Sequence, residues 1–319
     1  MGDIANLFIG NVDYRKYVEE TNDTDNKDII AFRDDYLAYK KIRKINNGQV
    51  FPWTKSHEKV WLNDGELTVW HGFTGHMKTQ VCLQLALGLV QQGVKVHVAS
   101  MELTPMELAG RLTALASGYQ DTSDKYDSAL FDYLAGKLFI YDRVDNVSHE
   151  EIQGMITHSA KVLGTKHIII DNLMTCGTSA TDYEDQSRFV KKLSALAKKY
   201  SIHIHLVAHA KKPESSKSSN PMPNSMYSIS GSSNIANIAN RIISVWYDKQ
   251  KKVYMEQGFP PDMEKSEVDK IKKAPDILLN VQKNRSRPYF EGYIGLWLVG
   301  GQVTEFNGKR LSFDIGFKG

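Results

Sequence analysis

From Phe51 onward, short apolar runs alternate with longer segments of helical periodicity. Strands that are apolar almost throughout, with helices between them, are typical of a parallel sheet covered on both faces. The alternation therefore predicts an α/β fold with a mainly parallel sheet. The strands expected for this sheet span residues 65–72, 94–100, 137–142, 167–173 and 202–210.

Four further apolar runs lie between residues 241 and 306 without long helices between them. Antiparallel neighbours can be joined by a short turn, whereas parallel neighbours need a long crossover. We therefore expect these runs to extend the sheet in antiparallel fashion. Residues 260–275 form a charged insertion among them, which we interpret as a solvated excursion without chemistry of its own.

The first 50 residues are highly charged and lack any apolar run of strand length. Apolar and aromatic side chains recur there at spacings of three and four, which predicts one amphipathic helix. This helix either packs on its own domain or docks on a partner, and the linker-like residues 45–50 favour the partner. We expect an N-terminal arm with a linker helix over residues 1–50 and one large domain over 51–319. The residues that define the helix are Ile29, Phe32, Tyr36 and Tyr39.

The chain has 40 Lys and Arg against 37 Asp and Glu, a formal net charge of +3. A nucleic-acid partner would therefore be held by local basic loops rather than by the whole surface. Residues 211–225, rich in Ser, Pro and Lys, are expected to form a mobile loop. No apolar run approaches the roughly 18 residues that span a bilayer, and no secretory signal or presequence is visible. Cys82 and Cys176 lie far apart, which fits a reducing compartment and a cytoplasmic location.

Residues 72–79 (GFTGHMKT) stand directly between the first expected strand and its helix. A phosphate-binding loop needs glycines whose N–H groups point at the anion, a Lys for the β- and γ-phosphates, and a hydroxyl for Mg²⁺. Lys78 and Thr79 have the required spacing from Gly72, but Met77 stands where the pattern has glycine, and its Cβ restricts the backbone. The alternative is an ordinary glycine-containing turn. The residues predicted to bind the nucleotide are Gly72, Thr74, Gly75, His76, Met77, Lys78 and Thr79.

Three polar side chains follow other apolar strands, at the carboxyl edge where open α/β sheets bind ligands. Asp171 ends the run HIIID and is, with Thr79, the candidate metal ligand. Glu102 follows residues 94–100 and is the candidate group that polarises the attacking water. The alternative for Glu102 is an acid near a helix N-terminus. His209 ends another strand, and although a lone histidine is usually structural, its convergence with the other groups favours a catalytic role.

Lys283 and Arg285 follow a late apolar run and are two residues apart, which puts them on one face of a strand. A guanidinium offers the γ-phosphate a fixed fork of donors that lysine cannot reproduce. We interpret Arg285 as a catalytic arginine that acts on the neighbouring subunit, with Lys283 beside it. A solvated basic turn is the alternative.

These motifs, in this order over about residues 51–306, resemble the hexameric replicative helicases with a RecA-like core. This family includes bacterial DnaB, the helicase half of phage primase–helicases and the mitochondrial helicase Twinkle. The phrase GELTVWHGFTGHMKT is most similar to the Twinkle and phage branch. The resemblance implies a RecA-like P-loop NTPase core behind an N-terminal linker helix. It also implies ATP (or another NTP or dNTP) with Mg²⁺, in a bacterial or phage-infected cell.

Within this family, the residue matching Glu102 is the catalytic base, and the position of His209 senses the γ-phosphate. Lys211 and Lys217 match lysines that contact single-stranded DNA in the central channel. Ser230 and Gly231 resemble a family turn, R-G-S-G, that also contacts DNA, although Ser230 replaces its arginine.

The function implied by the resemblance is an ATP-driven ring that moves along single-stranded DNA and unwinds duplex. Its partners would be single-stranded DNA, further copies of the chain in a hexamer, and a primase or loader on another chain, with no membrane. The rival interpretation is a RecA-like recombinase, or a ring or filament ATPase that does not unwind. The amphipathic helix before the core and the pair Lys283 and Arg285 favour the helicase.

Overall fold

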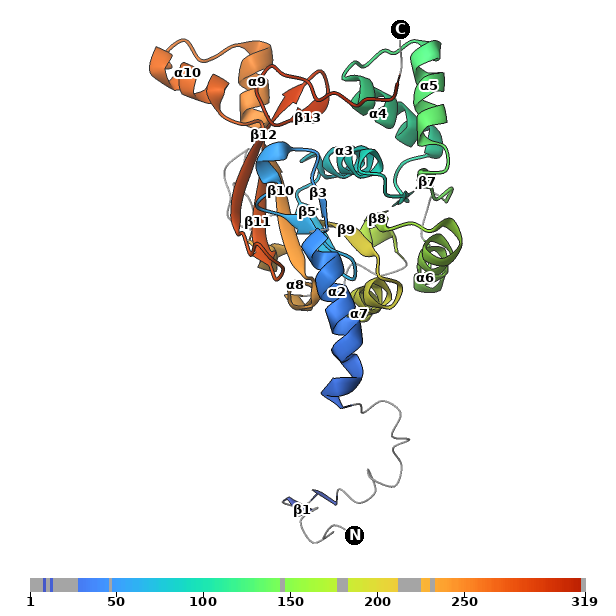
Figure 1. The fold of residues 1–319 in the computed structure, drawn as a ribbon. Coiled ribbons are helices and arrows are strands. Elements are labelled where there is room, and N and C mark those ends of the chain that lie inside the picture. The colour runs from blue at the N-terminus through green and yellow to red at the C-terminus, as the bar shows by residue number, and fades with distance from the viewer. Residues whose placement is uncertain are drawn as a thin grey trace. The chain divides into compact units, whose positions relative to one another are not determined.

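One nine-stranded sheet organises residues 48–319. Its strands are β5 (Leu67–Gly72), β6 (Val96–Ser100), β7 (Leu138–Ile140), β8 (His167–Asp171), β9 (His203–His209), β10 (Arg241–Tyr247), β11 (Ile277–Asn284), β12 (Gly292–Val299) and β13 (Gln302–Thr304). In space they follow the order β13-β12-β11-β10-β5-β9-β8-β6-β7 (Figure 1). The computed structural model describes residues 8–9, 12–13, 28–45, 48–143, 147–176, 183–211, 225–229 and 233–316.

The expected α/β fold with a RecA-like core is confirmed, and one detail of the late strands is wrong. Strands β5 to β9 and also β10 pair in parallel, with β10 beside β5. Within this sheet the antiparallel strands are β11, β12 and β13. The apolar run of β10 carries no signal of its direction, because a buried strand has the same composition in either orientation. The antiparallel extension therefore begins one strand later than predicted.

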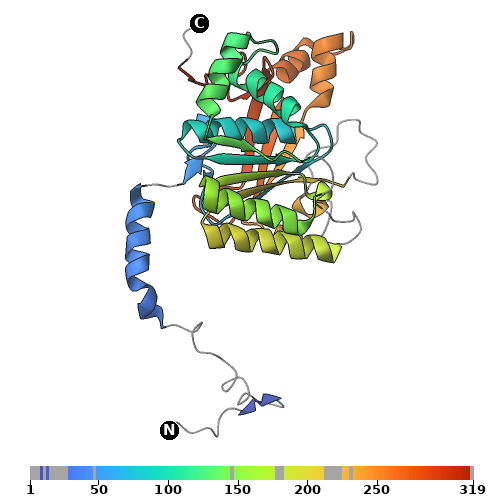
Figure 2. The same cartoon turned by 90° about the vertical axis from the view of Figure 1, so that its right-hand side faces the viewer.

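Helices cover both faces of the sheet (Figure 2). The helices of this unit are α3 (Lys78–Gln91), α4 (Pro105–Ser117), α5 (Asp124–Leu134), α6 (His149–His158), α7 (Tyr183–Tyr200), α8 (Ser233–Ile238), α9 (Lys249–Gln257) and α10 (Lys265–Lys273). One apolar cluster joins α3, α4 and α5 to one face, and a second joins α6, α7 and α8 to the other. Strand β8 shows the division, since Ile169 belongs to the first cluster and Ile168 and Ile170 to the second.

Local signals set the ends of the helices around the sheet. Helix α4 begins with a capping box, in which Thr104 and Glu107 bond each other's backbone N–H groups, and it ends at Gly118 with φ of 76°. Helices α9 and α10 occupy the charged insertion between β10 and β11. Short elements complete the unit: β3 (Gln49–Val50), β4 (Trp61–Leu62), the 3-10 turns η3 (Thr54–Ser56), η5 (Leu173–Thr175) and η6 (Met226–Ser228), and a π-helical turn, η4 (Ser159–Leu163).

Residues 1–47 form a separate compact unit. It contains β1 (Phe8–Ile9), β2 (Val12–Asp13), a 3-10 turn η2 (Ile29–Phe32) and helix α2 (Arg33–Ile45). The predicted apolar stripe is exposed, at 83% for Ile29, 47% for Phe32 and 58% for Tyr36. The division of the chain into an arm and a core domain is treated below as a proposal. None of the described helices combines the length and apolar character needed to cross a bilayer.

Three fully buried histidines lie side by side on β8 and β9. The ring centroids of His203 and His205 are 4.5 Å apart, and each lies 5.3 Å from that of His167. Trp70 donates its indole N–H to Nδ1 of His205, so Nε2 of His205 carries the proton and donates to Nδ1 of His167, 3.0 Å away. His167 in turn donates to Oε1 of Gln49 over 3.1 Å. The chain of hydrogen bonds requires neutral imidazoles.

Candidate active site

The phosphate-binding loop connects β5 to α3 at the carboxyl edge of the parallel strands. Gly75 has φ of 75°, a backbone conformation that favours glycine. A Cβ on Gly72 would collide with the carbonyl of Val245 on the neighbouring strand β10. The loop is therefore shaped by glycines at two positions, and it aims its backbone at the N-terminus of α3, where anions bind favourably.

Met77 adopts the left-handed conformation that a glycine would take, with φ of 65° and ψ of 19°. For a residue with a Cβ this conformation costs about 1–2 kcal/mol. The side chain is partly buried against the apolar cluster of α3 to α5, and this packing offsets part of the cost. The loop thus has the required backbone despite the departure from the sequence pattern.

Lys78 points into the loop, where Nζ donates to the carbonyls of Gly72 at 3.0 Å and Phe73 at 2.9 Å. The residue is only 6% exposed. Burial lowers the pKa of the ammonium, and the nearby carboxylates of Asp171 and Glu102 oppose that shift. A buried cation with two carboxylates nearby is suited to bind phosphate oxygens, because it has little hydration to lose.

Thr79 and Asp171 meet across the sheet edge, where the hydroxyl of Thr79 donates to Oδ2 of Asp171 over 2.6 Å. Burial raises the pKa of the Asp171 carboxyl, and the Thr79 hydrogen bond works against that. One hydroxyl and one carboxylate fit Mg²⁺, which binds to few protein oxygens and completes its shell with phosphates and water. No group of three or more His, Cys, Asp or Glu within the described residues could form an all-protein metal site. The donor set agrees with the Mg²⁺ ligands predicted from the sequence.

Glu102, Asn172 and His209 form a second cluster beside the loop. The Asn172 amide donates to Oε1 of Glu102, and its Nδ2 lies 3.1 Å from Nε2 of His209. Nε2 of His209 is also 3.6 Å from Oε1 of Glu102. The hydrogen bond with His209, helped by Asn172 and Lys78, lowers the pKa of Glu102 despite its partial burial. Glu102 is therefore ionised at neutral pH and oriented by two partners.

His209 also faces the loop, because its Nδ1 lies 3.4 Å from both the Thr74 hydroxyl and Nζ of Lys78. One imidazole therefore contacts the loop through one nitrogen and the Glu102 cluster through the other. Asn172, which completes this arrangement, was missed in the sequence. It directly follows Asp171, and an amide after a strand is too common to stand out.

Two further groups hold the loop from the side of β10. The His76 side chain accepts the N–H of Tyr247 over 3.0 Å, and it is 3% exposed. Its imidazole thus anchors the loop, and only its backbone remains for the predicted contact with nucleotide. Burial, with the nearby charges of Lys249 and Lys78, lowers the pKa of His76 to about 4. Lys249, which the sequence reasoning missed, donates to the carbonyl of Thr74 over 3.3 Å.

Comparison with known proteins agrees with this geometry. The AAA domain family matches residues 51–215, which include every group of the loop and of the Glu102 cluster. The chain belongs to the AAA domain family.

This AAA-family chain is also similar to a solved structure, the ATPase domain of a DnaB-like phage helicase. The two share 14% identity and superimpose with a TM-score of 0.67 over 86% of this chain and 99% of that one. At this identity the likeness establishes the fold. The two findings together support the resemblance to helicases with a RecA-like core. They also support ATP hydrolysis as the chemistry of this AAA-family domain.

Lys283 and Arg285 lie outside the residues that match the family, and at the other edge of the sheet. Strand β11 is antiparallel to β10, and Asn284 pairs with Arg241 at the start of β10. Arg285 is exposed and donates its backbone N–H to Asn240 over 3.0 Å. Lys283 donates to the backbone carbonyls of Ala236 and Asn237 of α8. The pair is thus separated from the phosphate loop of its own chain, and Lys283 is occupied by α8.

Of the predicted DNA-binding residues, Lys211 lies in the described part, whereas Lys217, Ser230 and Gly231 lie outside it. Most of the expected Ser- and Pro-rich loop, residues 212–224, also lies outside the described residues. Lys211 is exposed two residues after His209. Its Nζ lies 3.3 Å from the hydroxyl of Tyr183 and 4.8 Å from the centroid of that ring.

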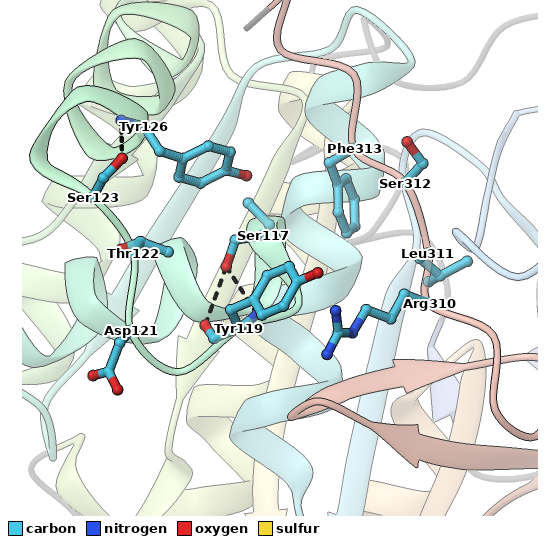
Figure 3. Close-up of a pocket in the computed structure, with 11 residues that line it drawn as sticks. Ser117, Tyr119, Asp121, Thr122, Ser123, Tyr126, Arg310, Leu311, Ser312 and Phe313 are labelled. Carbon is cyan, nitrogen blue, oxygen red and sulfur yellow. Dashed lines mark hydrogen bonds between the residues drawn. The ribbon is translucent and has the colours of Figure 1, made fainter. Parts of the chain in front are cut away.

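A cavity of about 520 Å³ lies away from all predicted residues, between the α4–α5 turn and the segment after β13. Figure 3 shows the Arg310 guanidinium beside the Tyr119 ring, 3.8 Å from its centroid, with Tyr126 and Phe313 on the opposite walls. None of these residues was singled out in the sequence.

Proposed function

We propose that this chain is a ring-forming replicative helicase that hydrolyses ATP to move along single-stranded DNA and unwind duplex. The observation that carries the proposal is His209, which joins the phosphate loop to the cluster of Glu102 and Asn172. Two residues later the chain reaches Lys211, an exposed cation. A group that contacts the nucleotide site and lies next to a DNA-binding loop can link hydrolysis to movement.

The residues divide the chemistry as follows. Lys78 binds the β- and γ-phosphate oxygens, and Thr79 with Asp171 holds Mg²⁺, which supplies charge neutralisation for the phosphates. Glu102 orients and polarises the attacking water, and its partners Asn172 and His209 keep it in place. Lowering the pKa of Glu102 keeps it anionic, so it acts through its charge and its acceptor oxygens.

Assembly would complete the site. The apolar stripe of α2 needs a partner, and a groove between α4 and α5 offers one on a second copy of the chain. This groove has a volume of about 280 Å³, is lined mainly by apolar side chains, and includes Phe131, which is 53% exposed. Head-to-tail contact of this kind closes into a ring when the rotation between subunits divides the circle.

A ring would also bring a cation to each site from the neighbouring subunit. Arg285 is exposed at the edge opposite its own loop, which suits a role in trans. In this proposal Arg285 contacts the γ-phosphate, and Lys283, held by the end of α8, positions the strand that carries it.

The rival function is that of a recombinase-like filament or a ring ATPase without unwinding. Both would share the hydrolytic site, so hydrolysis alone does not separate them. Strand displacement from a forked duplex does, because only the helicase releases the displaced strand with ATP.

The test is steady-state ATP hydrolysis with and without oligo-dT, followed by strand displacement. We expect DNA to stimulate hydrolysis, and we expect Lys78→Ala to abolish it. Lys252→Ala is the matched control, because Lys252 is exposed and pairs with Glu256 of the same helix, at 3.8 Å. Hydrolysis that continues in Lys78→Ala would reject the site, and hydrolysis without strand displacement would favour the rival.

A further inference from the structure

Two exposed tyrosines flank the cation that follows His209. Tyr183 begins α7 and is 43% exposed, and Tyr227 lies in η6 and is 66% exposed. The Lys211 ammonium lies over the ring of Tyr183, and the Lys211 backbone N–H donates to the carbonyl of Ser228 over 2.8 Å. Three segments distant in sequence thus bring two aromatic rings and one cation to the same edge of the sheet.

The backbone holds this group together. Ala210 forms an antiparallel bridge with Ile229, which is buried in the apolar cluster on the α7 side. The segment that carries Tyr227 is therefore fixed beside Lys211, and the exposure of its ring does not result from a loose chain. The nearby acid Asp185 is paired with Arg188 at 3.2 Å, which reduces its repulsion of an anionic strand.

We propose that Tyr183 and Tyr227 stack on bases of single-stranded DNA while Lys211 pairs with a phosphate. Proteins that bind single strands without sequence preference combine cations for the backbone with aromatic rings for the bases. The proposal rests on the proposed function and adds a base-dependent part to it. Lysines alone bind only the phosphates, so they would hold an abasic strand as tightly as a normal one.

The test compares oligo-dT with an abasic oligonucleotide of equal length by fluorescence anisotropy, using the full chain and a non-hydrolysable ATP analogue. The wild type should bind oligo-dT more tightly than the abasic strand. Tyr183→Ala and Tyr227→Ala should each weaken binding of oligo-dT by about fivefold to 150-fold. Neither should change binding of the abasic strand, and the Phe variants should retain most of the affinity. Tyr119→Ala, at an exposed tyrosine outside this group, is the matched control.

Salt dependence separates the aromatic part from the ionic part. Lys211→Gln should reduce the slope of log K against log salt by about 0.7, the value for one phosphate of a single strand. The tyrosine variants should leave this slope unchanged.

Each other outcome overturns the proposal in a distinct way. Equal wild-type affinity for the two oligonucleotides, with salt-dependent binding intact, rejects base stacking and leaves the proposed function standing. Alanine variants that weaken both strands equally show a structural role for the tyrosines. Absence of binding to either strand rejects the proposed function together with this inference.

Discussion

The three stacked histidines should make the stability of this protein steeply dependent on pH below neutrality. Burial lowers the pKa of His167 to about 3, and it lowers the pKa values of His203 and His205 well below the ordinary value of 6.5. In the unfolded chain each of them would bind a proton near pH 6.5. The unfolded state therefore binds more protons as the pH falls, and stability present above pH 6.5 is lost progressively toward the folded-state pKa values.

The magnitude follows from linkage. For one histidine with an unfolded pKa of 6.5 that remains neutral when folded, lowering the pH from 7 to 5 removes about 2 kcal/mol of unfolding free energy. The three together remove about 6 kcal/mol, a large part of the roughly 5–15 kcal/mol typical of a folded protein. Between pH 6 and 5 the slope from these three groups approaches about 4 kcal/mol per pH unit.

The assay is urea unfolding, followed by tryptophan fluorescence, at several pH values between 7 and 5. His167→Gln should lower the slope by about 1.4 kcal/mol per pH unit, the value for one proton. His158→Gln, at an exposed histidine, is the control and should leave the slope from the buried group in place. A wild-type slope below about 1.4 kcal/mol per pH unit in this range would refute the argument, because it would mean that fewer than one proton is taken up on unfolding.

Four further predictions concern the site and its assembly. Met77→Gly should be about 1 kcal/mol more stable than Met77→Ala in urea unfolding, because only glycine adopts positive φ without strain, and the reverse order would contradict the strain. Glu102→Gln should retain binding of a fluorescent nucleotide while phosphate release falls about 10²–10⁴-fold, whereas a parallel loss of binding would point to a structural role. Removal of residues 1–48 should dissociate the ring, since each buried apolar side chain contributes about 1.5–3 kcal/mol, and a truncated hexamer in light scattering would reject this role. Rings that mix Arg285→Ala with Lys78→Ala should recover part of the hydrolysis that each loses alone, and no recovery despite confirmed mixing would argue against Arg285 acting in trans.

Local sequence patterns were sufficient to predict the elements and part of the site. The apolar runs indicated the strands, because a strand buried on both faces must be apolar along its whole length. The spacing of Gly72, Lys78 and Thr79 pointed to the phosphate loop, since one loop between a strand and a helix contains all of its parts. Asp171 and Glu102 followed from the rule that ligands bind at the carboxyl edge.

Contacts between distant segments were beyond the reach of these patterns. The cluster of Glu102, Asn172 and His209 exists because β6, β8 and β9 are successive neighbours in the sheet, an order that differs from their order in the chain. Lys249 reaches the loop because β10 lies beside β5 and runs parallel to it. Neither the neighbour of a buried strand nor its direction is encoded in its composition.

The sequence by itself determined the kind of fold, the phosphate loop and the residue types that surround it, since each depends on neighbours within about one helical turn or one strand. The tertiary structure decided which of these residues meet. It put Met77 into a left-handed conformation that only the packed loop maintains, and it occupied the imidazole of His76 with the backbone of β10. It also placed Arg285 at the edge opposite its own loop, because the antiparallel direction of β11 carries the end of that strand away from the phosphates.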